Sequence, residues 1–468
     1  MTPDQLTPAG AGRDWAGRDW AGAAVLVVGI GVSGAAAARA LLARGARVRV
    51  VDAADGEPQR AAAAELRTLG AVVDLGGLPA DPGDAALVVT SPGVPPTASL
   101  ITASARAAVP VWGEVELAWR WRGEGRWLAV TGTNGKTTTT EMLGAMLAAG
   151  GRRSTTAGNI GTPIVEAVSA TPPYQALAVE LSSFQLHYAD TVAPLAATVL
   201  NVAPDHLDWH GGADAYAAAK ARIWRDPATI AVGNADDPAS SRLLAAAPGR
   251  RVLFGRDPAT RPALGLTVDA GHLVDREFGG GRLVDLRELA VTGPHMISNA
   301  LAAAALARAE GVEPAAIGAA LAGFRAGAHR NAEVAVLDGV RWVDDSKATN
   351  PHAAAASLTG YPSVVWIAGG LNKGLTFDDL VCQARGGLRG VVLIGRCADE
   401  IAVALARHAP DVPVERAAAM DDAVKAAAIL ARAGDTVLLA PAAASMDMFR
   451  DYAARGDAFA AAVRARSG

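Results

Sequence analysis

The sequence predicts an α/β protein composed of three consecutive α/β domains. Short apolar runs alternate with alanine-rich stretches of helical periodicity along most of the chain, a pattern typical of parallel sheets covered by helices. Glycine-rich or polar turns follow several of these runs directly, at the strand ends where such sheets bind ligands. A chain of 468 residues is also too long for one core and corresponds to about three domains of roughly 150 residues each.

Glycine and charged residues interrupt the pattern and divide the chain into four segments. Residues 1–22 contain a duplicated Gly-Arg-Asp-Trp-Ala among proline and glycine, without apolar periodicity, and are expected to form a mobile extension. The three domains are expected at residues 23–122, 123–327 and 328–468.

The apolar runs supply the expected strands. In the first domain they cover residues 25–29, 47–52, 86–90 and 109–112. In the second they cover residues 127–130, 177–181, 196–202 and 230–233, followed by helical stretches around Asn299 and Ala320. In the third, strands are expected near Val334, Val343, Val364, Val391 and Val437.

Composition argues against several classes of protein. The net charge is −4 and no basic cluster occurs, which disfavours nucleic acid as a partner. No apolar run reaches the roughly 20 residues of a membrane span, and the first residues lack the pattern of a secretory signal. The two cysteines, Cys382 and Cys397, are expected to be free thiols, so we expect a cytoplasmic protein. Independently of the cysteines, we prefer a monomer.

A phosphate-binding turn is predicted at residues 131–139, between an apolar run and a helix. Its glycines let backbone N–H groups face an anion, Lys136 can reach the outer phosphates, and the Thr137 hydroxyl can hold Mg²⁺ at the positive end of the helix. ATP is the expected ligand. Val130 occupies the position of the first glycine in the usual G-x-x-x-x-G-K-[ST] pattern, so an ordinary glycine-rich turn is the alternative.

The first domain begins with a second glycine-rich turn, at residues 29–34, and Asp52 closes the following strand. This pattern resembles a dinucleotide fingerprint, in which the glycines approach a diphosphate and the carboxylate binds a ribose hydroxyl. We favour a nucleotide diphosphate other than NAD, and a purely structural turn is a further interpretation. The turn at residues 91–93 ends a later strand of the same sheet and could close the same site.

Three polar residues of the second domain have both a functional and a structural interpretation. Glu180 ends an apolar strand and could hold Mg²⁺, or could simply face solvent. His206 could be a metal ligand or a phosphate contact, although a lone histidine is more often structural. Lys220 lies on a predicted helix, where a lysine usually points to solvent.

A dense polar turn at residues 343–351 is the strongest local signal in the third domain. Lys347 and Thr349 are placed to hold an anion at the start of the following helix, whereas helix capping explains only single residues of this run. Residues 369–373 and 442–445 follow two further strands of the same sheet. The three turns are therefore expected to lie together at one edge of the sheet and to surround a single opening, or mouth, of a binding site.

In their order along the chain, these motifs resemble those of the Mur ligases over roughly residues 23–466. The shared motifs are the phosphate turn, residues 180–186, Asn201 with Asp205 and His206, His329 with Arg330, and residues 345–350. The last run and residues 445–449 look like those of the family member that joins D-glutamate to UDP-N-acetylmuramoyl-L-alanine. The resemblance implies an ATP-dependent amide ligase of peptidoglycan precursor synthesis that works through an acyl phosphate. It also implies an N-terminal Rossmann-like UDP-substrate-binding domain, a central P-loop ATPase-type domain and a C-terminal Rossmann-like domain for the amino acid.

The resemblance assigns site residues by position. For the UDP substrate these are Gly31, Val32, Ser33, Asp52, Gly93, Asn159 and Gln185. For ATP they are Gly132, Thr133, Asn134, Gly135, Lys136, Thr137, Thr138, Asn299 and Arg330. Magnesium is assigned to Thr137, Glu180, His206 and a carbamylated Lys220, and catalysis to Lys136, His206 and Lys220. D-glutamate is assigned to Lys347, Thr349, Lys373, Ser445 and Tyr452.

Other functions are also compatible with parts of this pattern. A different Mur ligase or a folylpolyglutamate-synthase-like enzyme would share the ATP-dependent chemistry, although the latter is disfavoured by the full N-terminal α/β unit. An NAD-dependent oxidoreductase could be built on residues 29–34. A nucleotide-binding regulator would bind ATP without turnover.

Overall fold

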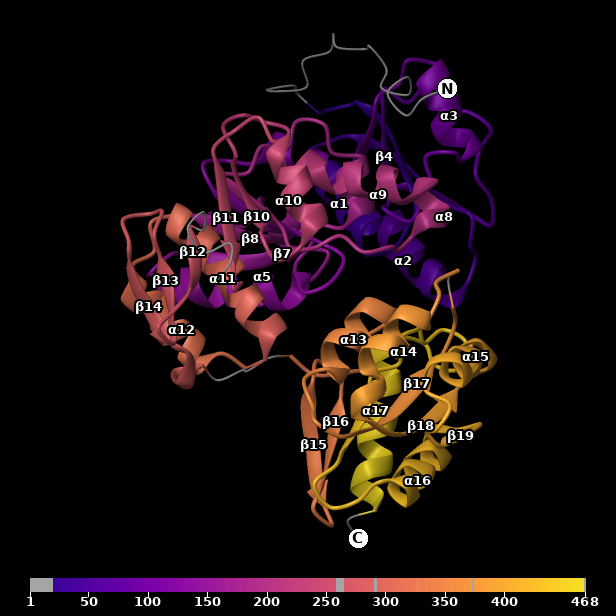
Figure 1. The fold of residues 1–468 in the computed structure, drawn as a ribbon. Helices are drawn as coiled ribbons and strands as arrows, with labels where there is room; N and C mark the ends of the chain where they lie inside the picture. The colour runs from indigo at the N-terminus through magenta and orange to yellow at the C-terminus, as the bar shows by residue number, and fades with distance from the viewer. Residues whose placement is uncertain (1–19, 258–264, 290–292, 326, 373, 467–468) are drawn as a thin grey trace. The chain divides into compact units, whose positions relative to one another are not determined.

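The computed structural model describes residues 20–257, 265–289, 293–325, 327–372 and 374–466. The chain forms two compact units. The first holds the described residues up to Val202, Leu207–Leu289 and Ser298–Gly323, and the second holds Ala203–His206, the described part of Ala290–Ile297 and the chain from Phe324 onward. Two sheets lie in the first unit and one in the second (Figure 1).

The first sheet has five parallel strands in the order β3-β2-β1-β4-β5. Its elements are β1 (Ala24–Val28), α1 (Val32–Leu42), β2 (Arg47–Asp52), α2 (Glu57–Thr68), β3 (Val72–Leu75), β4 (Leu87–Thr90), α3 (Ser99–Arg106), β5 (Val111–Gly113) and α4 (Glu114–Trp121). Val27 and Val50 are fully buried, as expected for a parallel sheet covered on both faces. The strand order reverses between β1 and β4, so the turns that follow these two strands meet at one edge of the sheet.

The second sheet has nine strands in the described part of the chain, in the order β14-β13-β12-β11-β10-β9-β6-β8-β7. Its strands are β6 (Arg126–Thr131), β7 (Ser154–Gly158), β8 (Ala176–Glu180), β9 (Ala196–Val199), β10 (Ile230–Asn234), β11 (Arg251–Gly255), β12 (Leu266–Asp269), β13 (His272–Asp275) and β14 (Gly281–Asp285). The helices are α5 (Lys136–Ala149), α6 (Ile164–Ala167), α7 (Ser183–His187), α8 (Leu207–His210), α9 (Ala213–Ala221), α10 (Pro238–Ala245), α11 (Pro294–Ala309) and α12 (Pro314–Gly323). β6 is paired on both sides, with β8 and β9, so the turn that follows it rests on a rigid strand.

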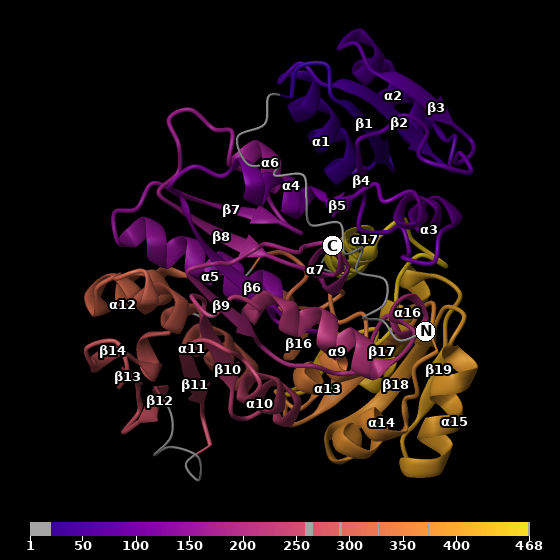
Figure 2. The same cartoon turned by 90° about the horizontal axis from the view of Figure 1, so that it is seen from above.

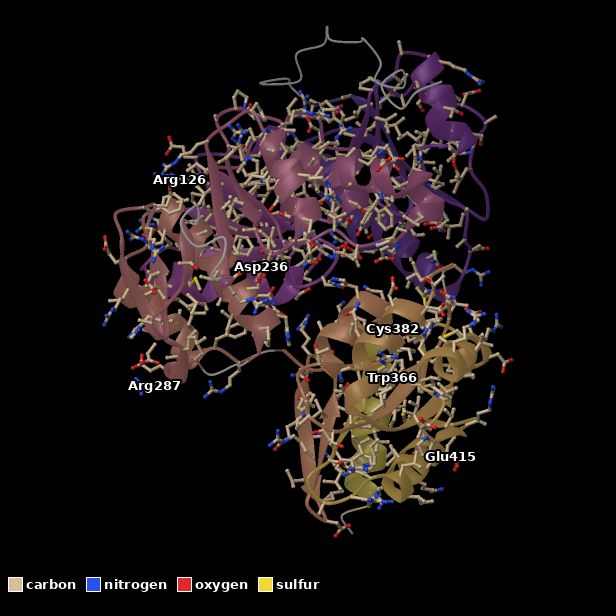
Figure 3. The ribbon with its side chains drawn as sticks, viewed as in Figure 1. Arg126, Asp236, Arg287, Trp366, Cys382 and Glu415 are labelled. Carbon is tan, nitrogen blue, oxygen red and sulfur yellow. The ribbon has the colours of Figure 1, made fainter. Side chains whose placement is uncertain are left out.

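The third sheet has the order β15-β16-β20-β17-β18-β19 among the residues described. Its elements are β15 (Ala332–Leu337), β16 (Val340–Asp344), α13 (Pro351–Leu358), β17 (Val364–Gly369), α14 (Asp378–Ala384), β18 (Leu388–Ile394), α15 (Ala398–His408), β19 (Val414–Arg416), α16 (Met420–Leu430), β20 (Thr436–Leu439) and α17 (Tyr452–Ala465). Trp366, labelled in Figure 3, is fully buried in β17, and its indole N–H donates to the Ala440 carbonyl over 2.7 Å.

Two buried carboxylates of α4 join the first sheet to the second, where α4 packs against α6 (Figure 2). Glu114 accepts from the Val165 N–H over 2.6 Å at the start of α6. Glu116 accepts from the N–H groups of Asp190 and Thr191 over 2.8 and 2.9 Å. Because buried N–H groups need partners, the two carboxylates stabilise the joint by accepting from amides on the side of the second sheet.

Every apolar run that was predicted to be a strand overlaps an observed strand. The sequence analysis did not predict β3, β7, β11 to β14 and β19. The pairing is antiparallel from β12 to β14 and between β15 and β16. The exact domain bounds stay a prediction.

The predicted mobile extension is wrong for residues 20–22. Trp20 is buried, and its ring meets that of Trp121 edge-on with centroids 5.1 Å apart. The Gly22 N–H donates to the Gly45 carbonyl over 2.8 Å. Trp20 is therefore packed against the domain, and residues 1–19 of the predicted extension lie outside the described residues.

The two cysteines are free, as expected, with Cys382 exposed and Cys397 buried. Burial raises the pKa of the Cys397 thiol to about 11. None of the helices in the described part of the chain combines the length and hydrophobicity that a membrane-spanning helix needs.

Replacing Glu114 with glutamine should make the stability of the protein less dependent on pH. Burial raises the pKa of the Glu114 carboxyl to about 7, so its contribution to stability is complete below about pH 4.5 and is lost as the pH rises through about 7. Glutamine cannot ionise. Between pH 5 and pH 8.5, we expect the free energy of unfolding of wild type to fall by up to about 3 kcal/mol relative to that of Glu114→Gln, measured by urea unfolding. Glu124→Gln, at an exposed position, is the control, and a pH-independent difference for Glu114→Gln would contradict this account.

Candidate active site

The turn predicted to bind phosphate connects β6 to α5. Its backbone needs glycine at two positions, because Gly132 has φ 155° and Gly135 has φ 83°. Asn201, which follows β9, holds the turn from the side: its side-chain oxygen accepts from the Asn134 N–H over 2.9 Å, and its side-chain amide donates to the Asn134 carbonyl over 3.1 Å. The sequence analysis gave Asn201 no site role, since nothing local marks it as a partner of a turn 67 residues away.

Two lysines converge on the Gly132 carbonyl. Lys136 donates to it over 2.9 Å and to the Thr133 carbonyl over 2.8 Å. Lys220 donates to the same Gly132 oxygen over 2.7 Å and lies 4.4 Å from the ring centroid of Tyr216. Two cations beside the positive end of α5 form an arrangement that is suited to binding phosphate oxygens.

The expectation that Lys220 points to solvent is wrong. Its exposed fraction is 1%. The helix α9 turns it inward toward the phosphate turn, and the Tyr216 hydroxyl of the same helix lies 3.0 Å from that of Thr133. The family resemblance, in contrast, assigned Lys220 to the site.

Asn299 lies directly against the phosphate turn. A Cβ added at Gly135 would be 2.5 Å from the Asn299 side-chain oxygen. Thr137 and Thr138, in the first turn of α5, are 8% and 7% exposed. The residues assigned to ATP in the first unit are therefore gathered at one end of β6, whereas Arg330 belongs to the second unit.

Glu180 has the character of a cation ligand. It is 1% exposed at the end of β8, and one of its oxygens accepts from the Asn159 amide over 2.8 Å. The other, Oε2, is buried and has no hydrogen-bond partner among the residues that the structure describes. A buried carboxylate oxygen with no donor fits a bound cation, since leaving it unsatisfied is costly.

No preformed cage accompanies Glu180 among the described residues. No group of three or more His, Cys, Asp and Glu side chains is close enough there to hold a metal ion. His206, which the resemblance assigned to the metal, falls in the second unit. Thr137 and Lys220, the other two residues that the resemblance assigned to the metal, lie in the same unit as Glu180.

The glycine-rich turn of the first domain is held by Asp52. Its two carboxylate oxygens accept from the N–H groups of Ile30 and Ala54, both over 2.8 Å. Gly31 and Gly93 are exposed, and Val32 is 77% exposed although it is apolar. The turn thus presents backbone and one apolar side chain at its surface, while Asp52 is engaged in shaping it.

Gln185 shapes the start of α7. Its side-chain oxygen accepts from the Ser182 N–H over 2.9 Å, and the Ser182 hydroxyl accepts from the Gln185 N–H over 3.1 Å. This reciprocal pair is a capping box. Gln185 is 4% exposed. The side chain that was predicted to contact the substrate therefore also orders the backbone at the start of α7.

Lys347 and Tyr452 are neighbours in the second unit. The Lys347 ammonium lies 3.8 Å from the centroid of the Tyr452 ring. The Ser346 hydroxyl donates to the Tyr452 carbonyl over 2.7 Å, and Ser445 is buried. Lys373, also assigned to D-glutamate, lies outside the described residues.

A buried arginine that the sequence analysis missed connects the turns of the second unit. Arg455, in α17, is 1% exposed. It donates to the Ser346 hydroxyl and carbonyl over 3.0 and 2.9 Å, and to the carbonyls of Ala443 and Gly369 over 3.1 and 3.4 Å. Burial lowers its pKa to about 10. One side chain thus holds the ends of β16, β17 and β20 together, as the prediction of one mouth requires.

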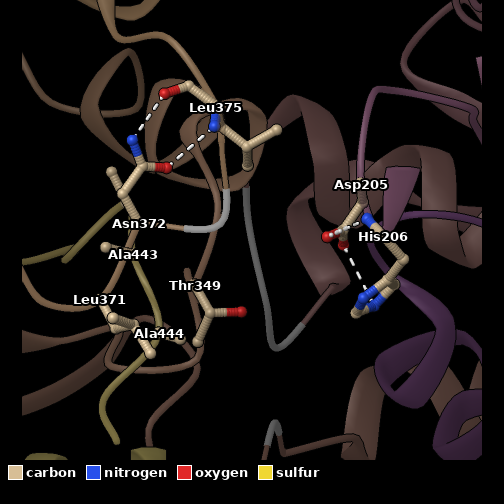
Figure 4. A pocket seen from close by; sticks show the side chains of 9 residues that line it. Asp205, His206, Thr349, Leu371, Asn372, Leu375, Ala443 and Ala444 are labelled. Atoms are coloured by element: carbon tan, nitrogen blue, oxygen red, sulfur yellow. Dashed lines mark hydrogen bonds and ion pairs between the residues drawn. The ribbon is translucent and has the colours of Figure 1, made fainter. Parts of the chain in front are cut away.

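A pocket of the second unit opens beside these turns (Figure 4). Its lining residues are Asp205, His206, Thr349, Leu371, Asn372, Leu375, Ala442, Ala443 and Ala444. Asn372 and Leu375 shape one wall, because the Asn372 side chain bonds both the N–H and the carbonyl of Leu375, over 2.9 and 2.8 Å. Of the predicted site residues, Thr349 and His206 line this pocket.

The fold and the phosphate turn define a nucleotide-binding α/β protein with a P-loop-like site. Three family models match it in sequence: the Mur ligase MurD-like N-terminal domain at residues 23–113, the Mur ligase middle domain at residues 130–307, and the Mur ligase glutamate ligase domain at residues 328–443. The chain therefore belongs to the Mur ligase family. The MurD-like match covers the glycine-rich turn, so the oxidoreductase interpretation loses its main support.

Similar proteins cover almost the whole chain. The UDP-N-acetylmuramoylalanine–D-glutamate ligase of Frankia casuarinae is 83% identical over 444 residues, which is 95% of this chain and 94% of that protein. The protein of the same name from Thermobifida fusca is 54% identical over 95% of this chain and 98% of its own length. Among solved structures, the UDP-N-acetylmuramate-alanine ligase MurC of Thermotoga maritima matches with a TM-score of 0.57 at 20% identity, over 94% of this chain and 99% of that chain. The last match supports the three-domain fold.

Replacing Gly135 with alanine should impair ATP binding. The new Cβ would clash with Asn299 in a backbone conformation of φ 83° that alanine rarely adopts. We expect the Kd for ATP, measured by calorimetry, to rise at least about tenfold, because the N–H groups of the turn would be displaced. Gly151→Ala is the matched control: it has φ 73°, but a Cβ there meets nothing within 4 Å. If both variants bind ATP like wild type, the turn does not carry the nucleotide.

Proposed function

We propose that this protein is an ATP-dependent ligase that joins D-glutamate to UDP-N-acetylmuramoyl-L-alanine, with release of ADP and phosphate. The observation that carries the proposal is the 83% identity to the Frankia casuarinae ligase of that name over 95% of the chain. The phosphate turn with Lys136 and Lys220 supplies the ATP chemistry that amide formation between a carboxylate and an amine requires.

The alanine carboxylate of the acceptor would take the γ-phosphoryl group of ATP and become an acyl phosphate. The amine of D-glutamate would then attack the acyl carbon, and the tetrahedral intermediate would collapse to the amide and inorganic phosphate. Lys136 and the first N–H groups of α5 would stabilise negative charge on the transferred group. The side chains would act mainly by positioning and charge, as in other phosphoryl transfers.

Magnesium is the expected metal, and Thr137, Glu180, His206 and a carbamylated Lys220 are the residues that would hold it. When bound, Mg²⁺ would neutralise charge on the phosphate oxygens. The partnerless Glu180 oxygen supports the assignment. Lys220 is as buried as Glu180, and carbamylation would convert its cation into a carboxylate-like ligand.

The substrates would bind on different parts of the chain. The UDP group is assigned to Gly31, Val32, Ser33, Asp52 and Gly93 of the first domain, with Asn159 and Gln185 from the second. D-glutamate is assigned to Lys347, Thr349, Lys373, Ser445 and Tyr452, and Arg330 to the nucleotide. The protein would act in the cytoplasm as a monomer, without nucleic acid.

The decisive assay is phosphate release from ATP with Mg²⁺ and UDP-N-acetylmuramoyl-L-alanine. We expect release only with D-glutamate, and not with L-glutamate, L-alanine or meso-diaminopimelate. Lys136→Ala should lower kcat by at least about 100-fold, because a charged donor to the phosphates is lost. Lys425→Ala, at an exposed lysine of α16, is the control. Release with another amino acid would point to a different Mur ligase, and ATP binding without release would point to a regulator.

Lys220→Arg should distinguish between two possible roles of Lys220, as a carbamate that serves the metal and as a cation. Arginine keeps the positive charge but cannot form a stable carbamate at neutral pH. We expect a loss of at least about 100-fold in kcat if the carbamate serves the metal and the phosphates. Wild type incubated with ¹³C-bicarbonate should show a carbamate carbon signal by NMR that Lys220→Arg lacks. An active arginine variant and no such signal would show that Lys220 acts as a cation.

A further inference from the structure

A tyrosine next to the helix that carries Gln185 holds a turn of the first domain. Tyr188 directly follows α7 and is 7% exposed. Its hydroxyl donates to the Val94 carbonyl over 2.9 Å. Val94 closes the turn after β4, since its N–H donates to the Ser91 carbonyl over 3.1 Å. Tyr188 and Val94 are 94 residues apart in sequence, and they lie on either side of the joint formed by α4.

The turn after β4, which Tyr188 holds, is also hydrogen-bonded to the glycine-rich turn after β1. The Ser91 hydroxyl donates to the Gly29 carbonyl over 3.2 Å. Packing here is close, because a Cβ added at Gly29 would be 2.6 Å from the Ser91 hydroxyl oxygen. Asp52 then fixes the remainder of the glycine-rich turn through the Ile30 N–H. A continuous set of hydrogen bonds therefore runs from Tyr188 to the exposed backbone around Gly31.

The other end of this set is anchored on α7. The Tyr188 N–H donates to the Gln185 carbonyl over 3.2 Å, and the Tyr188 carbonyl accepts from the Gly113 N–H over 3.0 Å. Gln185 is itself fixed by its capping box with Ser182. Tyr188 is thus bonded through its backbone to the candidate substrate residue Gln185 and through its hydroxyl to the turn that contains Gly93.

Burial keeps the Tyr188 hydroxyl a donor. The pKa of this phenol is raised well above its ordinary value because the ring is desolvated. The rings of His187 and Trp209 lie edge-on to it, with centroids 4.9 and 6.3 Å away, and fix its orientation. The hydrogen bond to Val94 is therefore expected to persist across the whole working pH range.

We propose that Tyr188 is a positioning residue for the nucleotide-sugar acceptor, and that it sets the turns of the first domain relative to Gln185 before the acceptor binds. This inference rests on the proposed function for the identity of the acceptor. A ligand that spans the turns at Gly31 and Gly93 on one side and Gln185 on the other loses less entropy on binding when these groups are already in place.

The test is Tyr188→Phe, which removes only the hydroxyl. We expect the KM for the UDP-sugar substrate and the Kd for UDP alone to rise about three- to tenfold, as the loss of one hydrogen bond implies, while the KM for ATP and the kcat stay within twofold of wild type. Ser91→Ala should show the same selective loss. The matched control is Tyr174→Phe, because Tyr174 stacks on Arg153 away from the candidate site.

Each outcome separates this inference from its alternatives. A lower melting temperature with unchanged KM and unchanged UDP binding would make Tyr188 purely structural and would overturn the proposal, as would an equal rise in the KM of all three substrates. UDP binding by calorimetry needs no turnover. If wild type binds UDP but releases no phosphate, and Tyr188→Phe still binds UDP more weakly, the positioning role stands and the proposed function fails.

Discussion

The hydrogen bonds that shape the turn after β6 are the constraint on which the rest of the candidate site depends. Gly132 offers a single carbonyl oxygen to both Lys136 and Lys220, and Asn201 fixes the same turn at Asn134. Each of these bonds fixes a backbone group or a cation at the turn, which would reduce the reorganisation needed when a nucleotide binds there. The paired strands on both sides of β6 explain why the turn can hold this shape.

Several carboxylates in the first unit act through backbone amides. Asp52 orders the glycine-rich turn, and Glu114 and Glu116 bind N–H groups across the joint between the two sheets. A carboxylate that accepts two N–H bonds replaces the water that those amides would lose on burial. Asp52 therefore does not need to contact a ribose to be important, and this role of its carboxylate was not among the interpretations made from the sequence.

The sequence was sufficient where a signal is local and insufficient where it is not. Apolar runs followed by glycine or polar residues predicted the strands and the turns at their ends, because period, length and turn chemistry lie within about ten residues. Lys220 was assigned to solvent on general grounds, since its partner Gly132 is 88 residues away. Arg455 was missed for the same reason, as its bond to Ser346 spans 109 residues. The family resemblance supplied Lys220 by position, but the burial that explains it is visible only in the fold.

Lys220 and Arg455 show how the choice of cation matters in a buried site. Both are 1% exposed and both donate to backbone carbonyls, one in each unit. Arg455 donates three hydrogen bonds to carbonyls and one to a hydroxyl. A planar guanidinium that stays charged is suited to holding three turns together permanently. An amine can lose its proton and react with CO₂, so a lysine beside the phosphate turn can change the sign of its charge, which an arginine cannot. Arg455 is therefore suited to a fixed structural role in the second unit, whereas Lys220 in the first unit would become a carboxylate-like ligand if it is carbamylated as we propose.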